Sequence, residues 1–140
     1  MDHPNQQIIN AFFDAYGKRD WDAIRRVMTE DAMWIARGNH PLSGVKRGLQ
    51  AVIAFFDAMG TVMGSSNVKV DKLVVGANDQ YVVESERVWT NRTDGINLDH
   101  QVCVLWRFKG GKIVEGVHFF ADPQGADQFF TAVASKSSPR

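Results

Sequence analysis

The side chain best suited to acid–base chemistry is His118, which lies in the apolar run Gly116-Val117-His118-Phe119-Phe120. Apolar neighbours on both sides place this histidine within a strand rather than in a loop. An imidazole titrates near neutral pH and can take up or release a proton there. Buried polar groups are normally hydrogen-bonded, so a structural histidine of the core is the alternative. His118 is therefore a candidate general acid or base.

Aromatic residues supply a second set of polar atoms, because an indole N–H or a phenol O–H needs a partner when it is buried. Tyr16, Trp34, Trp89 and Trp106 are expected to pack in the core, and one of them could also contact a substrate oxygen. His100 could be a second acid–base group, although a position at the exposed rim of a strand is the alternative.

Other reactive motifs are missing from the sequence. Gly110-Gly111 reads as a hairpin turn rather than a phosphate-binding loop, and no HExxH or paired-histidine motif is present. The single cysteine, Cys103, forms no intrachain disulfide, and Ser85 lacks the context of a nucleophile. We expect no metal, no cofactor and no covalent nucleophile.

Composition limits the remaining classes. The chain has 140 residues, with 16 basic and 16 acidic side chains, so its formal charge is zero. A neutral chain of this length predicts one domain and gives no electrostatic reason to bind nucleic acid or an anionic membrane. No apolar run approaches the roughly 20 residues of a membrane span. We therefore expect a soluble, cytoplasmic protein.

Helical periodicity dominates the first half of the chain. A three- and four-residue apolar spacing predicts a first helix, with Asn5 as its N-cap and Gly17 as its C-cap. Asp20 opens a second, short helix, and the apolar spacing from Leu49 predicts a third. Between them, residues 32–36 form a short strand.

The second half has the alternating pattern of strands. Strands are expected over 68–75, 81–91, 100–108 and 113–120, separated by turn sequences, with a short helix over 127–133. Helices followed by hairpin-linked strands predict an α+β domain, in which the helices cover one face of a curved antiparallel sheet and leave a pocket.

Several local strings resemble a known family. They are Phe12-Phe13-Asp14-Ala15-Tyr16, Arg19-Asp20-Trp21-Asp22-Ala23-Ile24, Thr29-Glu30-Asp31-Ala32, Gly44-Val45-Lys46-Arg47-Gly48, Trp106-Arg107-Phe108 and Gly110-Gly111-Lys112-Ile113. Through them the chain resembles the SnoaL-like polyketide cyclase and ketosteroid isomerase-related group of the nuclear transport factor 2-like superfamily. The resemblance implies a conical α+β barrel with a pocket between the first helix and the sheet. It implies one SnoaL-like domain over 1–134, and we expect residues 135–140 to be a disordered tail.

The resemblance also allows catalytic positions to be compared. Ketosteroid isomerases use a tyrosine and two aspartates, and the matching positions here hold Phe12, Ala36 and Val104, so that mechanism is not expected. Limonene epoxide hydrolases use an arginine with carboxylates and a water-holding pair. Arg87 matches their arginine, and the other four positions hold Trp89, His118, Trp34 and Ala36.

Strand alternation and the resemblance together predict the pocket wall. The resemblance assigns the faces that carry Arg87, Val104 and His118 to the pocket. The predicted catalytic residues are His118 and Arg87, and the predicted substrate-binding residues are Phe12, Tyr16, Trp34, Trp89, His100, Val102, Val104 and Phe120. Arg87 would meet a substrate oxygen or an internal carboxylate such as Asp14 or Asp122. Apolar surroundings and the guanidinium predict a pKa of His118 below about 6.5.

Two classes of function follow. In the first, a cofactor-independent enzyme acts on a small apolar oxygenated molecule: His118 removes a proton next to a carbonyl, and Arg87 with a tryptophan N–H stabilises the oxyanion. Isomerisation, cyclisation and dehydration share this step, and activation of water as in an epoxide hydrolase is an alternative. In the second, the chain is a non-catalytic module that binds a small ligand or a protein.

The predicted outer face of the sheet is apolar. It carries Val82, Val88, Cys103, Leu105, Val117 and Phe119. An exposed patch of this kind favours a twofold homodimer through the convex face.

Overall fold

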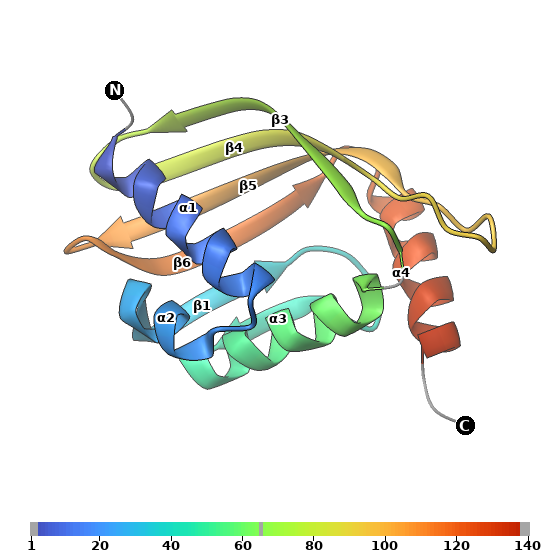
Figure 1. The fold of residues 1–140 in the computed structure, drawn as a ribbon, viewed down its shortest axis with the longest axis horizontal. Helices are drawn as coiled ribbons and strands as arrows, with labels where there is room; N and C mark the ends of the chain where they lie inside the picture. Colours follow the sequence, from blue (N-terminus) through green and yellow to red (C-terminus); the bar gives the residue numbers. More distant parts are fainter. Residues whose placement is uncertain (1–2, 65, 138–140) are drawn as a thin grey trace.

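The computed structural model describes residues 3–64 and 66–137 (Figure 1). In chain order the elements are α1 (Pro4–Gly17), α2 (Trp21–Val27), β1 (Met28–Ala36), β2 (Gly44–Arg47), α3 (Leu49–Met63), β3 (Lys69–Ala77), β4 (Tyr81–Trp89), β5 (Asp99–Lys109), β6 (Lys112–Phe120) and α4 (Pro123–Ser137). The α+β prediction is confirmed. Strand β2 was not predicted, and α4 is longer than expected. Residues 135–137 belong to this helix rather than to a tail, and residues 138–140 lie outside the described residues.

The strands form one sheet in the order β2-β1-β6-β5-β4-β3. Strands β1 and β6 pair in parallel, and all other neighbours are antiparallel. The sheet is curved and unclosed; α1 lies against β3 and β4, and α3 lies against β1 and β2 (Figure 1). Helix α4 stands at the end of β6 and contacts α3. The concave side of the sheet is thus enclosed by helices.

Two helix starts follow local capping chemistry. Asp20 caps α2 as predicted, because its carboxylate accepts a hydrogen bond from the Ala23 N–H at 3.1 Å. The predicted cap of α1 is wrong: His3 caps the helix, with Nδ1 accepting from the Asn5 N–H. The Asn5 side chain instead donates to the carbonyls of Asn78 and Asp79, which ties α1 to the turn between β3 and β4.

Aromatic rings fill the space between the helices and the sheet. Trp34 and Trp106 meet edge to face with ring centroids 5.0 Å apart, and Phe12 and Phe56 contact this pair. Gly116 lies beneath the Trp34 ring, and a Cβ there would collide with it. The indole can therefore lie over β6 at this point only because residue 116 has no side chain.

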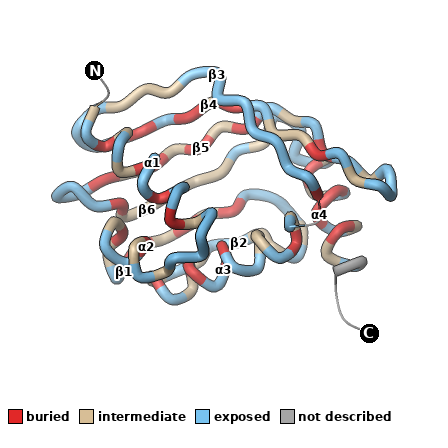
Figure 2. Tube along the Cα trace, viewed as in Figure 1, coloured by how far each residue is buried: buried red, intermediate tan, exposed pale blue. Residues whose placement is uncertain are grey.

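Strand β4 presents the face opposite to the one expected. Val82, Glu84 and Glu86 are buried, whereas Arg87 is exposed; Figure 2 shows the alternation along β4 and β5. The register explains this orientation, because Glu84 pairs with Val104 and Glu86 pairs with Val102, both on the concave face. The predicted orientation of this strand is wrong. Val82 and Val88 accordingly lie inside and drop out of the predicted convex face.

Candidate acid–base site

Two adjoining cavities lie between the helices and the concave face of the sheet. The inner cavity has a volume of about 100 Å³ and is lined by Phe13, Tyr16, Trp34, Phe55, Phe56, Met59, Glu86, Val104, Trp106 and His118. The outer cavity has a volume of about 180 Å³ and is lined by Tyr16, Met59, Met63, Val68, Val70, Glu86, Val88, Leu98, Val102, His118, Phe120 and Phe130. Tyr16, Met59, Glu86 and His118 line both. The titratable side chains thus border both of two largely apolar spaces.

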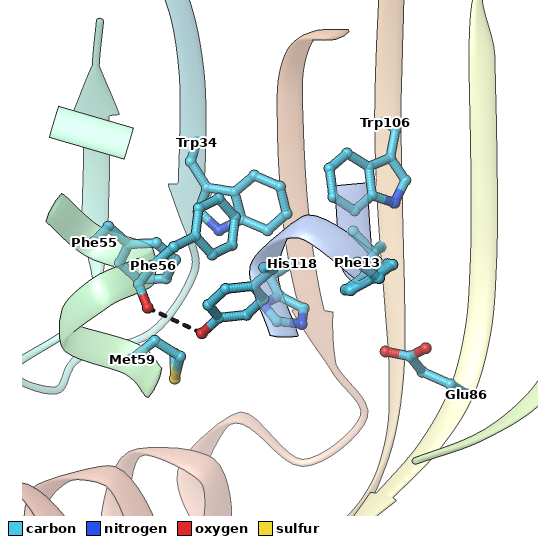
Figure 3. Close-up of a pocket in the computed structure, with 10 residues that line it drawn as sticks. Phe13, Trp34, Phe55, Phe56, Met59, Glu86, Trp106 and His118 are labelled. Carbon is cyan, nitrogen blue, oxygen red and sulfur yellow. Dashed lines mark hydrogen bonds between the residues drawn. The ribbon is translucent and has the colours of Figure 1, made fainter. Parts of the chain in front are cut away.

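His118 reaches both cavities from β6. Its ring packs edge to face on Trp34, with centroids 5.9 Å apart (Figure 3). The imidazole also lies 5.3 Å from the Phe120 ring, measured between ring centroids. No residue in the described part of the chain forms a hydrogen bond with the imidazole. Burial, followed by the charge of His40, lowers the pKa of His118 from 6.5 to about 4. The expected direction of this shift is confirmed, and burial is the cause as predicted, but the Arg87 guanidinium does not contribute to it. The imidazole is neutral at pH 7.

Glu86 is a titratable residue of the site that the sequence reasoning missed; the lining residues Phe13, Phe55, Phe56, Met59 and Trp106 were not among the predicted site residues either. The Glu86 side chain is only 6% exposed, and among residues 3–64 and 66–137 its carboxyl has no hydrogen-bond partner. Burial and then the nearby charge of Glu84 raise its pKa to about 7, while Lys72 acts in the opposite direction. The available signal was the alternation Val82-x-Glu84-x-Glu86-x-Val88, in which valines flank the glutamates on one face.

Glu84 lies on the same face, one pleat repeat away, and has different partners. It is fully buried, and one carboxylate oxygen accepts a hydrogen bond from the Trp106 indole at 3.0 Å. The Lys72 ammonium lies 3.2 Å from the other oxygen and 5.5 Å from the centre of the Phe13 ring. A buried carboxylate needs such partners, so Glu84 is held as a paired charge behind Glu86.

Two aromatic residues of the cavity wall carry polar atoms. The indole nitrogen of Trp34 is buried and has no hydrogen-bond partner within the described residues. The hydroxyl of Tyr16 donates to the Phe56 carbonyl at 2.9 Å, the dashed line in Figure 3, and burial raises its pKa. Trp34 therefore keeps an unused donor at the site, whereas the Tyr16 proton is already engaged.

Arg87 does not reach the cavities. Its guanidinium donates two hydrogen bonds, each of 2.9 Å, to the Asp99 carboxylate, and it lies 4.2 Å from the centre of the Trp89 ring. This cluster is on the convex side, because β4 is oriented opposite to the expectation. The predicted placement of Arg87 and Trp89 in the pocket is wrong. The carboxylate partner is Asp99 rather than Asp14 or Asp122.

The other predicted substrate-binding residues divide into two groups. Tyr16, Trp34, Val102, Val104 and Phe120 line at least one cavity. Phe12 is fully buried behind the wall, against Phe56 and Trp106, and Phe13 takes its place. His100 lies beside Phe120 and Asp122 and lines neither cavity. Its side chain is 13% exposed, so it is not the solvent-exposed histidine that the alternative prediction described.

Within residues 3–64 and 66–137, no three histidine, cysteine or acidic side chains gather closely enough to hold a metal ion. Nor does this part of the chain contain a helix that is long and apolar enough to cross a membrane.

Comparison with known proteins identifies relatives of the whole fold. The model of the SnoaL-like domain matches residues 9–116. An uncharacterised protein of Mycobacterium tuberculosis (strain H37Rv) is 25% identical over 130 residues, which cover 92% of this chain and 98% of that protein. The structure of Bal32a, from a soil-derived mobile gene cassette, matches with a TM-score of 0.78 and 26% identity over 91% of this chain and 96% of its own. A protein from Jannaschia sp. CCS1 that carries the name SnoaL-like polyketide cyclase matches with a TM-score of 0.69 and 20% identity, covering 100% and 99%.

Proposed function

Because the chain belongs to the SnoaL-like domain family, we propose that it is a cofactor-independent enzyme that moves a proton on a small apolar molecule bearing a carbonyl oxygen. Isomerisation, aldol-type cyclisation and dehydration all begin with this step. The Jannaschia relative carries the name of a polyketide cyclase, and cyclisation is one of these reactions. One observation carries the proposal: His118 faces an apolar cavity and has no hydrogen-bond partner in the described part of the chain.

The cavity supports the chemistry of an enolate. Its walls are mainly aromatic and aliphatic, so water is displaced when an apolar substrate binds, and each polar contact gains strength. A neutral imidazole can exchange a proton with the substrate or donate its N–H to the substrate oxygen. The unpartnered indole N–H of Trp34 is a second donor for the negative charge that develops on this oxygen.

Arg87 has no part in this proposal. Its guanidinium is on the other face of the sheet and is neutralised by Asp99. The oxyanion is therefore stabilised by uncharged donors, from His118 and Trp34, rather than by a full positive charge.

The test needs no knowledge of the natural substrate. 2-Tetralone is a flat, apolar ketone with acidic hydrogens next to its carbonyl, and proton NMR in D₂O follows their replacement by deuterium. We expect the protein to accelerate this exchange above the buffer rate. His118→Phe should reduce the acceleration by at least about 100-fold, the lower range of an acid–base contribution. His3→Gln, a change at the partly exposed N-cap of α1, outside both cavity linings, is the control.

A binding module remains the second candidate, because one polar group of the cavity is already used within the fold: the Tyr16 hydroxyl donates to Phe56. The same NMR samples discriminate between the two functions. Chemical-shift changes that show 2-tetralone bound in the cavity, with exchange at the buffer rate, would support binding without catalysis.

A further inference from the structure

We propose that Glu86 is the group that takes the proton from the substrate carbon, while His118 donates a hydrogen bond to the substrate oxygen. This assignment rests on the proposed function and divides the acid–base work between two residues. It makes Glu86 a catalytic residue that directly contacts the reacting atoms.

The geometry places the two side chains around one space. Glu86 and His118 line both cavities, and they extend from β4 and β6, with β5 between them. In the strand register Glu86 pairs with Val102, whereas His118 pairs with Val104. Two strand spacings and an offset of two residues separate the two backbones by about 12 Å, so one small molecule can lie between the two side-chain ends. Figure 3 shows the Glu86 carboxyl projecting from its strand into the site, on the side opposite Trp34 and Phe55.

The neighbours of Glu86 leave its carboxyl free to react. Glu84 on the same strand is engaged with Trp106 and Lys72, and it repels a negative charge on Glu86. Lys72 from β3 partly offsets this repulsion. From the other elements, Tyr16 on α1 and His118 on β6 line the same outer cavity, and His100 on β5 pairs with Val88 in the strand register. None of them forms a hydrogen bond with Glu86 in the described residues.

The proton affinities favour the same division of roles. A pKa of about 7 leaves about half of Glu86 ionised at neutral pH, and its carboxylate then binds a proton far more strongly than an imidazole whose pKa is about 4. A general base works best when its pKa is close to the working pH. His118 stays neutral at that pH, so one ring nitrogen carries a hydrogen that it can donate.

The step balances without any co-reactant. A Glu86 oxygen accepts the proton from the carbon next to the carbonyl, and the C–H electron pair becomes a carbon–carbon double bond. The carbonyl π pair moves to the oxygen, which accepts hydrogen bonds from the N–H groups of His118 and Trp34. Return of the proton from the Glu86 carboxylic acid to a carbon of the enolate completes an isomerisation.

The pH dependence of 2-tetralone exchange tests the assignment directly. A base must be deprotonated to act, so catalysis by Glu86 should increase with pH and reach half of its maximum near pH 7. Catalysis by His118 as the base would instead increase near pH 4 and stay level across neutral pH. A level profile between pH 5 and 8, after subtraction of the buffer rate, would overturn the proposal.

Matched variants provide a second test. Glu86→Gln should lower the exchange rate by at least about 100-fold. His118→Gln should lose less than His118→Phe, because a glutamine amide can still donate to the oxygen. Glu115→Gln changes the same chemical group on the convex side, where Glu115 pairs with Arg107, and should keep the wild-type rate.

The outcomes separate this assignment from the proposed function. Exchange by wild type with an unchanged rate in Glu86→Gln would overturn the role of Glu86 and leave the proposed function standing. Exchange no faster than buffer in wild type would overturn both. Infrared difference spectra give a readout without turnover: wild type should lose the band of a protonated carboxyl near pH 7, and Glu86→Gln should lack this transition. A carboxyl band in wild type that disappears only near pH 4.5 would also overturn the proposal.

Discussion

At the scale of single residues, burial shifts the pKa of His118 and that of Glu86 in opposite directions. The His118 imidazole loses affinity for its proton, and the Glu86 carboxyl gains affinity. Both shifts have the same physical origin, because a low-dielectric cavity disfavours whichever form of a side chain is charged. The result at neutral pH is an uncharged imidazole beside a carboxyl that is close to half-ionised.

These shifts predict opposite pH dependences of stability. For His118 the unfolded state binds more protons between about pH 4 and 6.5, so its contribution to stability increases with pH over that range. For Glu86 the folded state binds more protons between about pH 4.5 and 7, so its contribution decreases with pH. In wild type the two slopes largely cancel. Urea unfolding should therefore show stability that increases from pH 4.5 to 6.5 more steeply in Glu86→Gln than in wild type.

The complementary variant checks the sign. In His118→Gln only the Glu86 slope remains, so stability should fall relative to wild type as the pH is raised through the same range. Parallel stability curves for wild type and both variants would show that neither group changes its proton affinity on folding.

At the scale of elements, the ion pair between β3 and β4 explains how β4 can bury two glutamates. Lys72 reaches from the edge strand β3 to the fully buried Glu84, and the Trp106 indole on β5 satisfies the other oxygen. The concave orientation of β4 therefore depends on side chains from both neighbouring strands.

Removal of the Lys72 ammonium should show how much the burial of Glu84 depends on this cation. Lys72→Met leaves Glu84 without its cation and should lower the free energy of unfolding by about 2 kcal/mol, less than the roughly 3–5 kcal/mol of a fully buried pair, because Lys72 is half-exposed. Lys69→Met, an exposed change on the same strand, is the control. Equal urea midpoints for the two variants would contradict this account.

At the scale of the whole molecule, the convex face of the sheet carries an uncovered apolar row. Its members are neighbours in the strand register across five strands: Val45, Ile35, Val117, Leu105 and Val83. Phe119 and Cys103 adjoin the row, and Phe119 is 43% exposed. Val83 takes the place expected for Val82, and the apolar character of this face is retained.

This row leads us to expect a twofold homodimer through the convex face. Light scattering at micromolar concentration should give twice the chain mass of 15.7 kDa. Leu105→Glu places a charge in the middle of the row and should yield a monomer with unchanged far-ultraviolet circular dichroism. A monomeric mass for wild type would remove the dimer from consideration.

Much of the architecture could be predicted from the sequence, because it depends on short-range regularities. The helical spacing around Phe12 and Leu49, the cap at Asp20 and the turn at Gly110-Gly111 are local signals, and each of these elements is present. The short sequence strings shared with the SnoaL-like group predicted the overall fold, and the chain does match the model of that family. The apolar run around His118 also placed this residue correctly within a strand, because Val117, Phe119 and Phe120 favour a strand over a loop.

The orientation of β4 was decided only by the tertiary structure. Both faces of Tyr81–Trp89 carry apolar and charged side chains, so alternation alone does not distinguish them. Pairing with Val102 and Val104 on β5, and the compensation of Glu84 by Lys72 and Trp106, bring the glutamates inside. These partners are distant in the sequence, and for this reason local pattern placed Arg87 in the pocket and overlooked Glu86.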